Sequence, residues 1–150
     1  MKTKHSVILV VLLFLAGAIC AGAAESQNAS FAGTWKGDVN GAPAVELRLD
    51  EAKGKIGGEI VFYFQERPDR NGPWKVKGEA REPLLSPEVK GKVLTFEVRH
   101  HVCHTCKEYG PNVKFRVELT GPDEAHIWNL SEGNPDDDSD SGLPLRRAQK

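Results

Sequence analysis

The sequence predicts an all-β protein, a single antiparallel up-and-down β-barrel of about eight strands. From residue 31 onward, apolar and polar side chains alternate, which is typical of strands with one buried and one solvent-facing side. Segments rich in Gly, Pro and Asn separate the alternating runs, and helical periodicity is nearly absent. Eight is the number of strands at which a closed sheet either fills its interior or holds one small ligand.

The first 23 residues have the composition of a secretory signal peptide. Lys2 and Lys4 precede an apolar run, and the small residues at 21–23 suit cleavage of the Ala-x-Ala type. The run is shorter than the roughly 20 apolar residues that a membrane span needs, so no transmembrane span is expected. We therefore expect a secreted or periplasmic protein. Lipidation at Cys20 is not favoured, because the bulky Ile19 precedes it.

Residues 24–150 are long enough for one β-barrel domain with a single core. Removal of residues 1–23 takes away two lysines and no acids, which leaves 18 basic against 21 acidic residues and a net charge of −3. The clustered basic face that nucleic-acid binding requires is absent from the sequence pattern. We expect a monomer without a nucleic-acid partner.

The alternating runs predict eight strands, at residues 31–39, 43–51, 56–65, 74–79, 92–101, 112–120, 124–130 and 143–147. In the second run, Val45, Leu47 and Leu49 share one face. The fifth run alternates in the same way, and its periodicity extends to His100 on the inner face. The sixth run places Val113 and Phe115 on its apolar face. Asn40-Gly41 predicts a tight hairpin turn, because both residues accept positive φ angles.

Two stretches interrupt the strand pattern. Residues 66–92 contain four prolines and, apart from the short strand at 74–79, predict a long loop that forms a mouth or lid of the barrel. Residues 133–142, GNPDDDSDSG, predict an acidic flexible loop, because they lack the glutamate that completes a calcium-binding loop.

The segment FAGTWKGDV, residues 31–39, resembles the first strand of calycin barrels, which include lipocalins, fatty-acid-binding proteins and avidin-like proteins. The resemblance rests on Gly33 and Trp35, and the chain is similar to secreted bacterial proteins with a lipocalin-like domain. It implies that Trp35 closes the bottom of the barrel and that an arginine of the last strand packs over the indole. Arg146 and Arg147 are both candidates for that arginine.

The favoured function is non-catalytic binding of a small, apolar or amphipathic molecule inside the barrel. Trp35 would form the floor of the site, and Ile60, Phe62 and Phe64 share one face of the third strand and would form its wall. His100 would supply a polar contact at the mouth. The sequence contains no nucleophile elbow, phosphate-binding loop or zinc-protease motif, so we expect no enzymatic activity.

The segment HHVCHTC, residues 100–106, supports several alternatives. A disulfide between Cys103 and Cys106 is favoured, since an exported chain meets an oxidising compartment, and on that interpretation no cofactor is needed. The alternative is a zinc site formed by Cys103, Cys106 and histidines such as His100 and His104, or a thiol-redox function. A third hypothesis is a structural module that interacts with the cell envelope.

Overall fold

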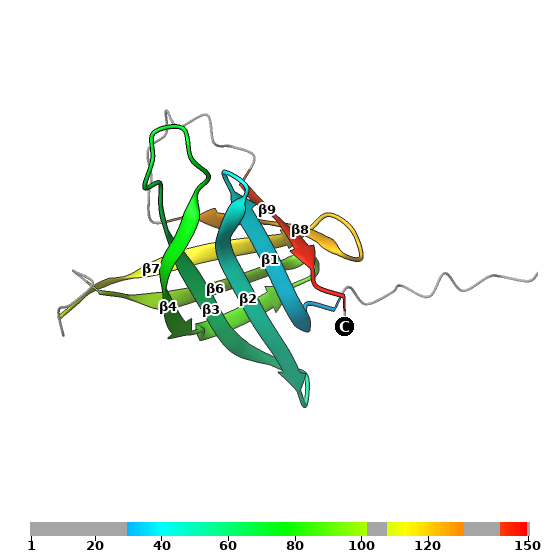
Figure 1. Ribbon diagram of the computed structural model, residues 1–150. Helices are drawn as coiled ribbons and strands as arrows, with labels where there is room; N and C mark the ends of the chain where they lie inside the picture. The colour runs from blue at the N-terminus through cyan, green and yellow to red at the C-terminus, as the bar shows by residue number, and fades with distance from the viewer. Residues whose placement is uncertain (1–29, 102–107, 131–141, 150) are drawn as a thin grey trace, which may run out of the picture.

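The computed structural model describes residues 30–101, 108–130 and 142–149. These residues form nine strands of one antiparallel sheet (Figure 1). The strands are β1 (Gly33–Val39), β2 (Ala42–Ala52), β3 (Lys55–Glu66), β4 (Lys75–Pro83), β5 (Leu85–Lys90), β6 (Val93–His101), β7 (Tyr109–Leu119), β8 (Glu124–Asn129) and β9 (Leu143–Arg147). No helix that is long and apolar enough to cross a membrane occurs in these three ranges.

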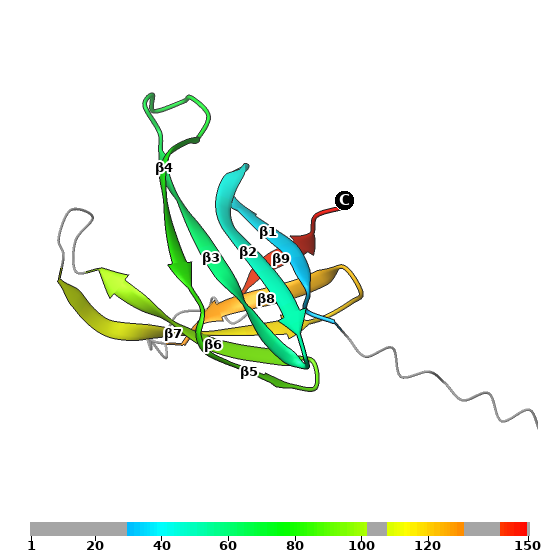
Figure 2. The same cartoon turned by 90° about the horizontal axis from the view of Figure 1, so that it is seen from below.

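The sheet has the order β4-β3-β2-β1-β9-β8-β7-β6-β5, so the first and last strands pair with each other at its centre. Consecutive strands are neighbours everywhere except at the step from β4 to β5, which form the two edges. The sheet curls into a half-barrel (Figure 2). The predicted all-β, antiparallel, up-and-down architecture is confirmed, whereas the predicted closed barrel of eight strands is not what the structure contains.

The predicted strand at 74–79 corresponds to β4, but the prediction that the rest of residues 66–92 is a loop is wrong, because β4 extends to Pro83 and β5 follows it. The prolines suggested a loop, but they occupy positions that tolerate proline. Pro83 is the last residue of β4, and Pro87 lies in β5, an edge strand in which an outward N–H is not needed for pairing. Ser86, with φ of 48°, accompanies an irregular register between β5 and β6.

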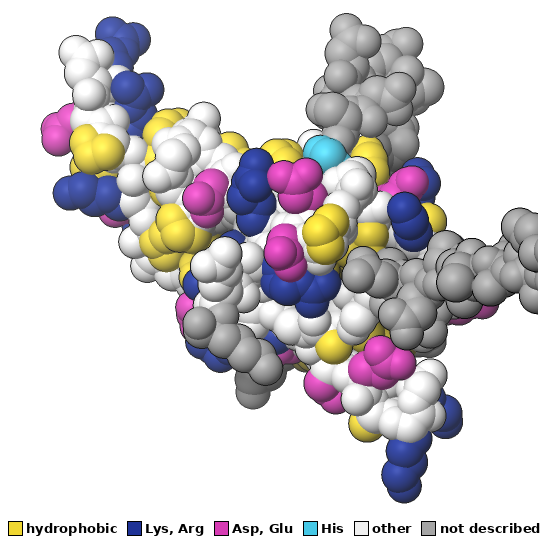
Figure 3. Space-filling view, turned by 90° about the vertical axis from the view of Figure 1, so that its right-hand side faces the viewer, with side chains coloured by type: hydrophobic (Ala, Val, Ile, Leu, Met, Phe, Trp, Pro, Cys, Tyr) yellow, Lys and Arg dark blue, Asp and Glu magenta, His cyan; other side chains and the backbone are white. Residues whose placement is uncertain are grey.

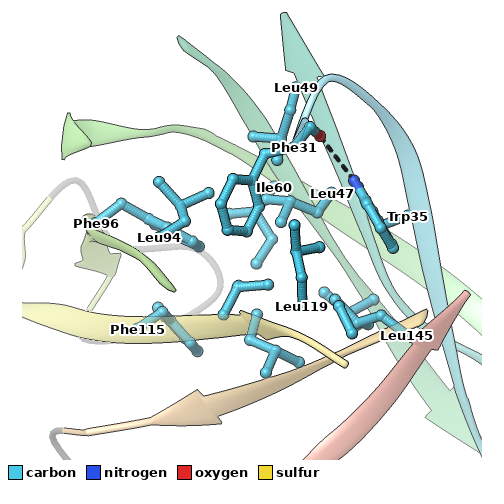
Figure 4. Close-up of a cluster of buried hydrophobic side chains, with 14 of the residues drawn as sticks. Phe31, Trp35, Leu47, Leu49, Ile60, Leu94, Phe96, Phe115, Leu119 and Leu145 are labelled. Carbon is cyan, nitrogen blue, oxygen red and sulfur yellow. Dashed lines mark hydrogen bonds between the residues drawn. The ribbon is translucent and has the colours of Figure 1, made fainter. Parts of the chain in front are cut away.

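The inner face of the sheet carries the hydrophobic core (Figure 4). The predicted alternation on β2, β6 and β7 is confirmed for the apolar side chains. The core residues from these three strands are Val45, Leu47, Leu49, Leu94, Phe96, Val98, Phe115, Val117 and Leu119. Each strand therefore contributes alternate residues to one continuous apolar cluster, as a sheet with a single buried face requires.

Tight turns and one close backbone contact set the curvature of the first three strands. The turn at Asn40 and Gly41 is confirmed, with φ angles of 55° and 75°. Gly58, in β3, has a φ of 141°, and a Cβ atom there would lie 1.9 Å from the carbonyl oxygen of Arg48. Only glycine permits β3 to approach β2 so closely at this point.

The two ends of the half-barrel differ. At one end, which we call the closed end, the N–H of Leu84 donates a hydrogen bond to the carbonyl oxygen of Gly58 at 3.0 Å, so the link between β4 and β5 is tied to β3. At the other, the open end, β3 is paired with β2 only as far as Phe62, and β5 accompanies β6 only as far as Glu97. Beyond these points, the hairpin of β3 and β4 projects from the body (Figures 1 and 3).

Candidate binding site at the open end

Trp35 lies at the centre of the closed end and is fully buried. Its indole Nε1–H donates a hydrogen bond to the carbonyl oxygen of Phe31 at 2.8 Å (Figure 4). This bond satisfies the polar edge of the ring, while the ring itself belongs to the apolar cluster that includes Leu47. Because the indole has no exposed surface, it contributes to the core rather than to an accessible wall.

Arg147, rather than Arg146, packs over the tryptophan. Its guanidinium carbon lies 4.2 Å from the centre of the Trp35 ring, a distance suited to a cation–π interaction. A Cβ atom on Gly33 would lie 3.1 Å from Nη1 of Arg147, so glycine at that position leaves room for the guanidinium. Arg146 points to the outer face and pairs with Glu124 at 3.0 Å.

The guanidinium of Arg147 also ties three segments of chain together at the closed end. It donates hydrogen bonds to the carbonyl oxygens of Ser30, at 2.7 Å, and Ala32, which precede β1. It donates another to the carbonyl oxygen of Pro122 at 3.1 Å and pairs with the Asp123 carboxylate at 3.0 Å, both in the turn between β7 and β8. These contacts join the last strand, the segment before β1 and the turn between β7 and β8 at the closed end.

The inner face of β3 changes from buried to exposed toward the open end. Ile60 is fully buried, Phe62 is half-buried against the core, and Phe64 is 41% exposed. The three side chains alternate along one strand face, as the sequence predicts, but they lie in different environments. Of these three side chains, only Phe62 and Phe64 present apolar surface that a ligand is able to contact.

Aromatic rings from three strands meet at the boundary between the core and the open end. The ring centres of Phe62 and Phe115 lie 5.8 Å apart, and Phe115 stacks on Phe96 with ring centres 5.6 Å apart. Val113, two residues before Phe115 on β7, is half-buried and packs against the same cluster. Sequence reasoning assigned Val113 and Phe115 to a buried face but not to a site. The curl of the sheet, which no local pattern specifies, brings Phe115 of β7 against Phe62 of β3.

The polar rim of the open end is formed by the end of β6 and the start of β7. His100 is exposed, and the register between β6 and β7 shifts between Val98 and His100. This irregularity interrupts the alternation that predicted an inward-facing imidazole. The neighbouring guanidinium of Arg99 lies 5.4 Å from the ring centre of Tyr109, which is among the most exposed aromatic side chains of the described residues.

The outer face carries a buried carboxylate that the sequence pattern places in water. Glu46 is 7% exposed and contacts Arg48 at 2.6 Å, Lys36 at 3.5 Å and the hydroxyl of Tyr63 at 3.4 Å. Burial raises the pKa of Glu46, but the hydrogen bond and positive charge of Arg48 and the charge of Lys36 outweigh it, so the net pKa is lowered. Burial and the charge of Glu46 raise the pKa of Tyr63. This network links β1, β2 and β3 on the outer face of the sheet. It is therefore separate from the candidate site, which lies on the inner face at the open end.

The segment 100–106 is only partly described. His100 and the backbone of His101 belong to β6, whereas Cys103, His104 and Cys106 lie outside the described residues, as do the leader at 1–23 and most of the acidic segment at 133–142. Within residues 30–101, 108–130 and 142–149, no group of three or more His, Cys, Asp or Glu side chains is arranged to hold a metal ion. The disulfide and zinc hypotheses remain predictions.

Comparison with known proteins yields no match. No family model, no curated protein and no solved structure is significantly similar to this chain.

Proposed function

We propose that this protein is a non-catalytic binding protein for a small, partly apolar molecule, which it holds at the open end of the half-barrel. The ligand would contact Phe62 and Phe64 on one side and Val113 on the other. Arg99 and His100 would lie at the rim, within reach of a polar group of the ligand. Trp35 and Ile60 would support this site from the core without touching the ligand.

The observation that carries the proposal is the gradient of burial along β3. Apolar residues continue along the inner face past the last core residue to Phe64, so β3 carries a large aromatic side chain that is still 41% exposed. An aromatic residue that is exposed next to a half-buried aromatic cluster is typical of a binding surface for apolar groups.

We also propose that the chain is calycin-like, which is a finer statement than an antiparallel half-barrel. Two contacts support it: the burial of Trp35 on the first strand and the position of Arg147, from the last strand, over its ring. A ligand inside the curled sheet, rather than on its outer face, would follow from that relationship. Fold similarity does not identify the ligand.

Fluorescence titration with the neutral apolar probe N-phenyl-1-naphthylamine tests the site. We expect the probe to gain fluorescence on binding, and Phe64→Ala to weaken its affinity about tenfold, because the loss of one aromatic contact costs on the order of 1–2 kcal/mol. Val89→Ala is the matched control, since Val89 is also an exposed apolar side chain, 42% exposed, but lies on the edge strand β5.

Two results would overturn the proposal. Absence of saturable probe binding would mean that the open end is not a site for apolar molecules. Equal loss of affinity in Phe64→Ala and Val89→Ala would mean that the probe binds diffusely to exposed apolar side chains.

A further inference from the structure

The hairpin that projects from the open end has an unusual charge. We call residues 64–78, the end of β3, the connecting turn and the start of β4, the basic arm. It carries the cations Arg67, Arg70, Lys75 and Lys77 and the acids Glu66 and Asp69, so its net charge is +2. The remaining residues carry 16 basic and 19 acidic side chains, a net charge of −3. The arm is therefore a positive projection on a negative chain.

The arm is ordered, so its cations have defined positions. The amide of Gln65, at its base, donates hydrogen bonds to the carbonyl oxygens of Ala42 and Pro43, both at 2.9 Å, which fixes β3 to the start of β2. In the turn, Nε of Arg67 donates to the carbonyl oxygen of Gly72 at 3.0 Å, so this cation braces the loop. The arm thus projects as a folded hairpin.

The cations of the arm differ in their partners. Lys77 pairs with Glu66 at 2.8 Å, and this contact raises the pKa of Lys77. Arg70 and Lys75 are exposed, and neither forms an ion pair with a residue of the described ranges. Two positive charges, Arg70 in the connecting turn and Lys75 at the start of β4, are therefore available to an external anion.

Apolar side chains accompany these charges. Val76 is 43% exposed, Phe64 is 41% exposed, and Trp74, next to Lys75, is half-buried. Figure 3 shows the projecting hairpin at the upper left with Lys and Arg side chains beside hydrophobic ones. Basic residues alternating with a tryptophan and an aliphatic residue are typical of segments that lie at the interface between water and lipid.

We infer that the basic arm docks the protein on an anionic lipid bilayer. A bilayer fits the arm for two reasons. A projecting hairpin touches an extended flat surface before the negatively charged body does, and such a surface presents many negative charges to Arg70 and Lys75 at once. Trp74 and Val76 then have an apolar region to enter, which a soluble polyanion does not offer. This inference does not depend on the proposed binding of a small ligand.

Sedimentation with lipid vesicles tests the inference. We expect the protein to bind vesicles of phosphatidylglycerol and phosphatidylcholine in equal parts, to bind pure phosphatidylcholine vesicles much more weakly, and to lose binding as salt is raised. The variant Arg70→Glu/Lys75→Glu should reduce binding to the anionic vesicles tenfold or more. This variant and the control variant described next are first checked for folding by circular dichroism.

The matched control is Lys53→Glu/Lys55→Glu. It makes the same change in net charge, but both lysines lie at the turn between β2 and β3, far from the arm in Figure 1. We expect this variant to bind the anionic vesicles within about twofold of the original protein. Equal loss in the two variants would overturn the inference, since binding would then follow net charge alone. Full binding by Arg70→Glu/Lys75→Glu, or no vesicle binding at all, would overturn it as well.

Failure of this test is distinguishable from failure of the proposed function. The probe N-phenyl-1-naphthylamine is neutral, and neither Arg70 nor Lys75 contributes to its proposed site. The charge-reversed variant should therefore bind the probe as the original protein does, whatever its behaviour toward vesicles.

Discussion

The closed end and the open end of the half-barrel are built from the same strands but use their side chains differently. At the closed end, Trp35 is fully buried and Arg147 satisfies carbonyl groups from two other segments. At the open end, Phe64 remains exposed and the charges of Arg70 and Lys75 have no partner among the described residues. The difference indicates that the closed end contributes more to the stability of the fold than the open end, to which we assign the proposed binding.

The largest expected effect is at the closed end. Trp35→Ala should lower the free energy of unfolding by about 3–5 kcal/mol, because it removes a buried aromatic ring and leaves a cavity. Trp74→Ala, in the basic arm, should lower it by about 1 kcal/mol or less. Urea unfolding followed by circular dichroism measures both values. A loss of similar size in the two variants would contradict the division into a stabilising and a binding end.

Substitution of Arg147 should have the second-largest effect on the free energy of unfolding. Arg147→Ala removes the contact with the Trp35 ring and hydrogen bonds to several carbonyl groups, so we expect a loss of about 2–3 kcal/mol. Arg146→Ala is the control in the adjacent position. Its pair with Glu124 is exposed on both sides, so its loss should cost about 0.5 kcal/mol or less. If both variants unfold at the same urea concentration, the packing of Arg147 over Trp35 does not stabilise the fold.

The carboxylate of Glu46 extends the comparison to the dependence of stability on pH. The pKa of Glu46 is lowered in the folded state from its ordinary value of 4.5. The unfolded chain therefore takes up the proton first as the pH falls, and the stabilisation, complete above pH 4.5, is lost as the pH drops through the folded pKa.

Glu46→Gln should lower the free energy of unfolding by about 1–2 kcal/mol at pH 7. The difference from the original protein should shrink below pH 4.5, and urea unfolding at a series of pH values measures it. Glu66→Gln, which removes the exposed partner of Lys77, should have little effect on the free energy of unfolding at pH 7. A constant difference for Glu46→Gln across the pH range would show that its charge is not the stabilising feature.

Apart from the control variants, the smallest expected effect on stability is at Phe64. Phe64→Ala should change the free energy of unfolding by about 1 kcal/mol or less, because the side chain is 41% exposed and lies outside the core. The same variant should lose most of its affinity for the apolar probe. Large losses of both stability and affinity would assign Phe64 to the core and remove the argument for a site beside it.

Local sequence patterns predicted the strands and their buried faces well. The alternation of Val45, Leu47 and Leu49 and the turn at Asn40-Gly41 are confirmed, because period-two burial and positive φ angles are local properties. The burial of Glu46 was missed, since it depends on Lys36 from a neighbouring strand as well as on Arg48. The strand β5 was missed because its proline is tolerated only at an edge, and edges are defined by the whole sheet.

The candidate site was only partly predictable. The sequence identified Phe62 and Phe64 as neighbours on one face, but it grouped them with Ile60, which the structure buries completely. Whether an inner-face residue is packed or accessible depends on how far β2 and β5 accompany the longer strands. That length is set by the pairing of distant segments, which the alternation within one strand does not encode.

A nitrogen–proton correlation spectrum recorded during titration with N-phenyl-1-naphthylamine tests most directly whether binding belongs to the open end. We expect the amide signals of Phe62, Phe64 and Val113 to shift on addition of the probe, while the indole signal of Trp35, buried at the closed end, stays in place. Shifts centred on Trp35 and its neighbours, with the signals of Phe64 and Val113 unchanged, would contradict the assignment of binding to the open end and of stability to the closed one.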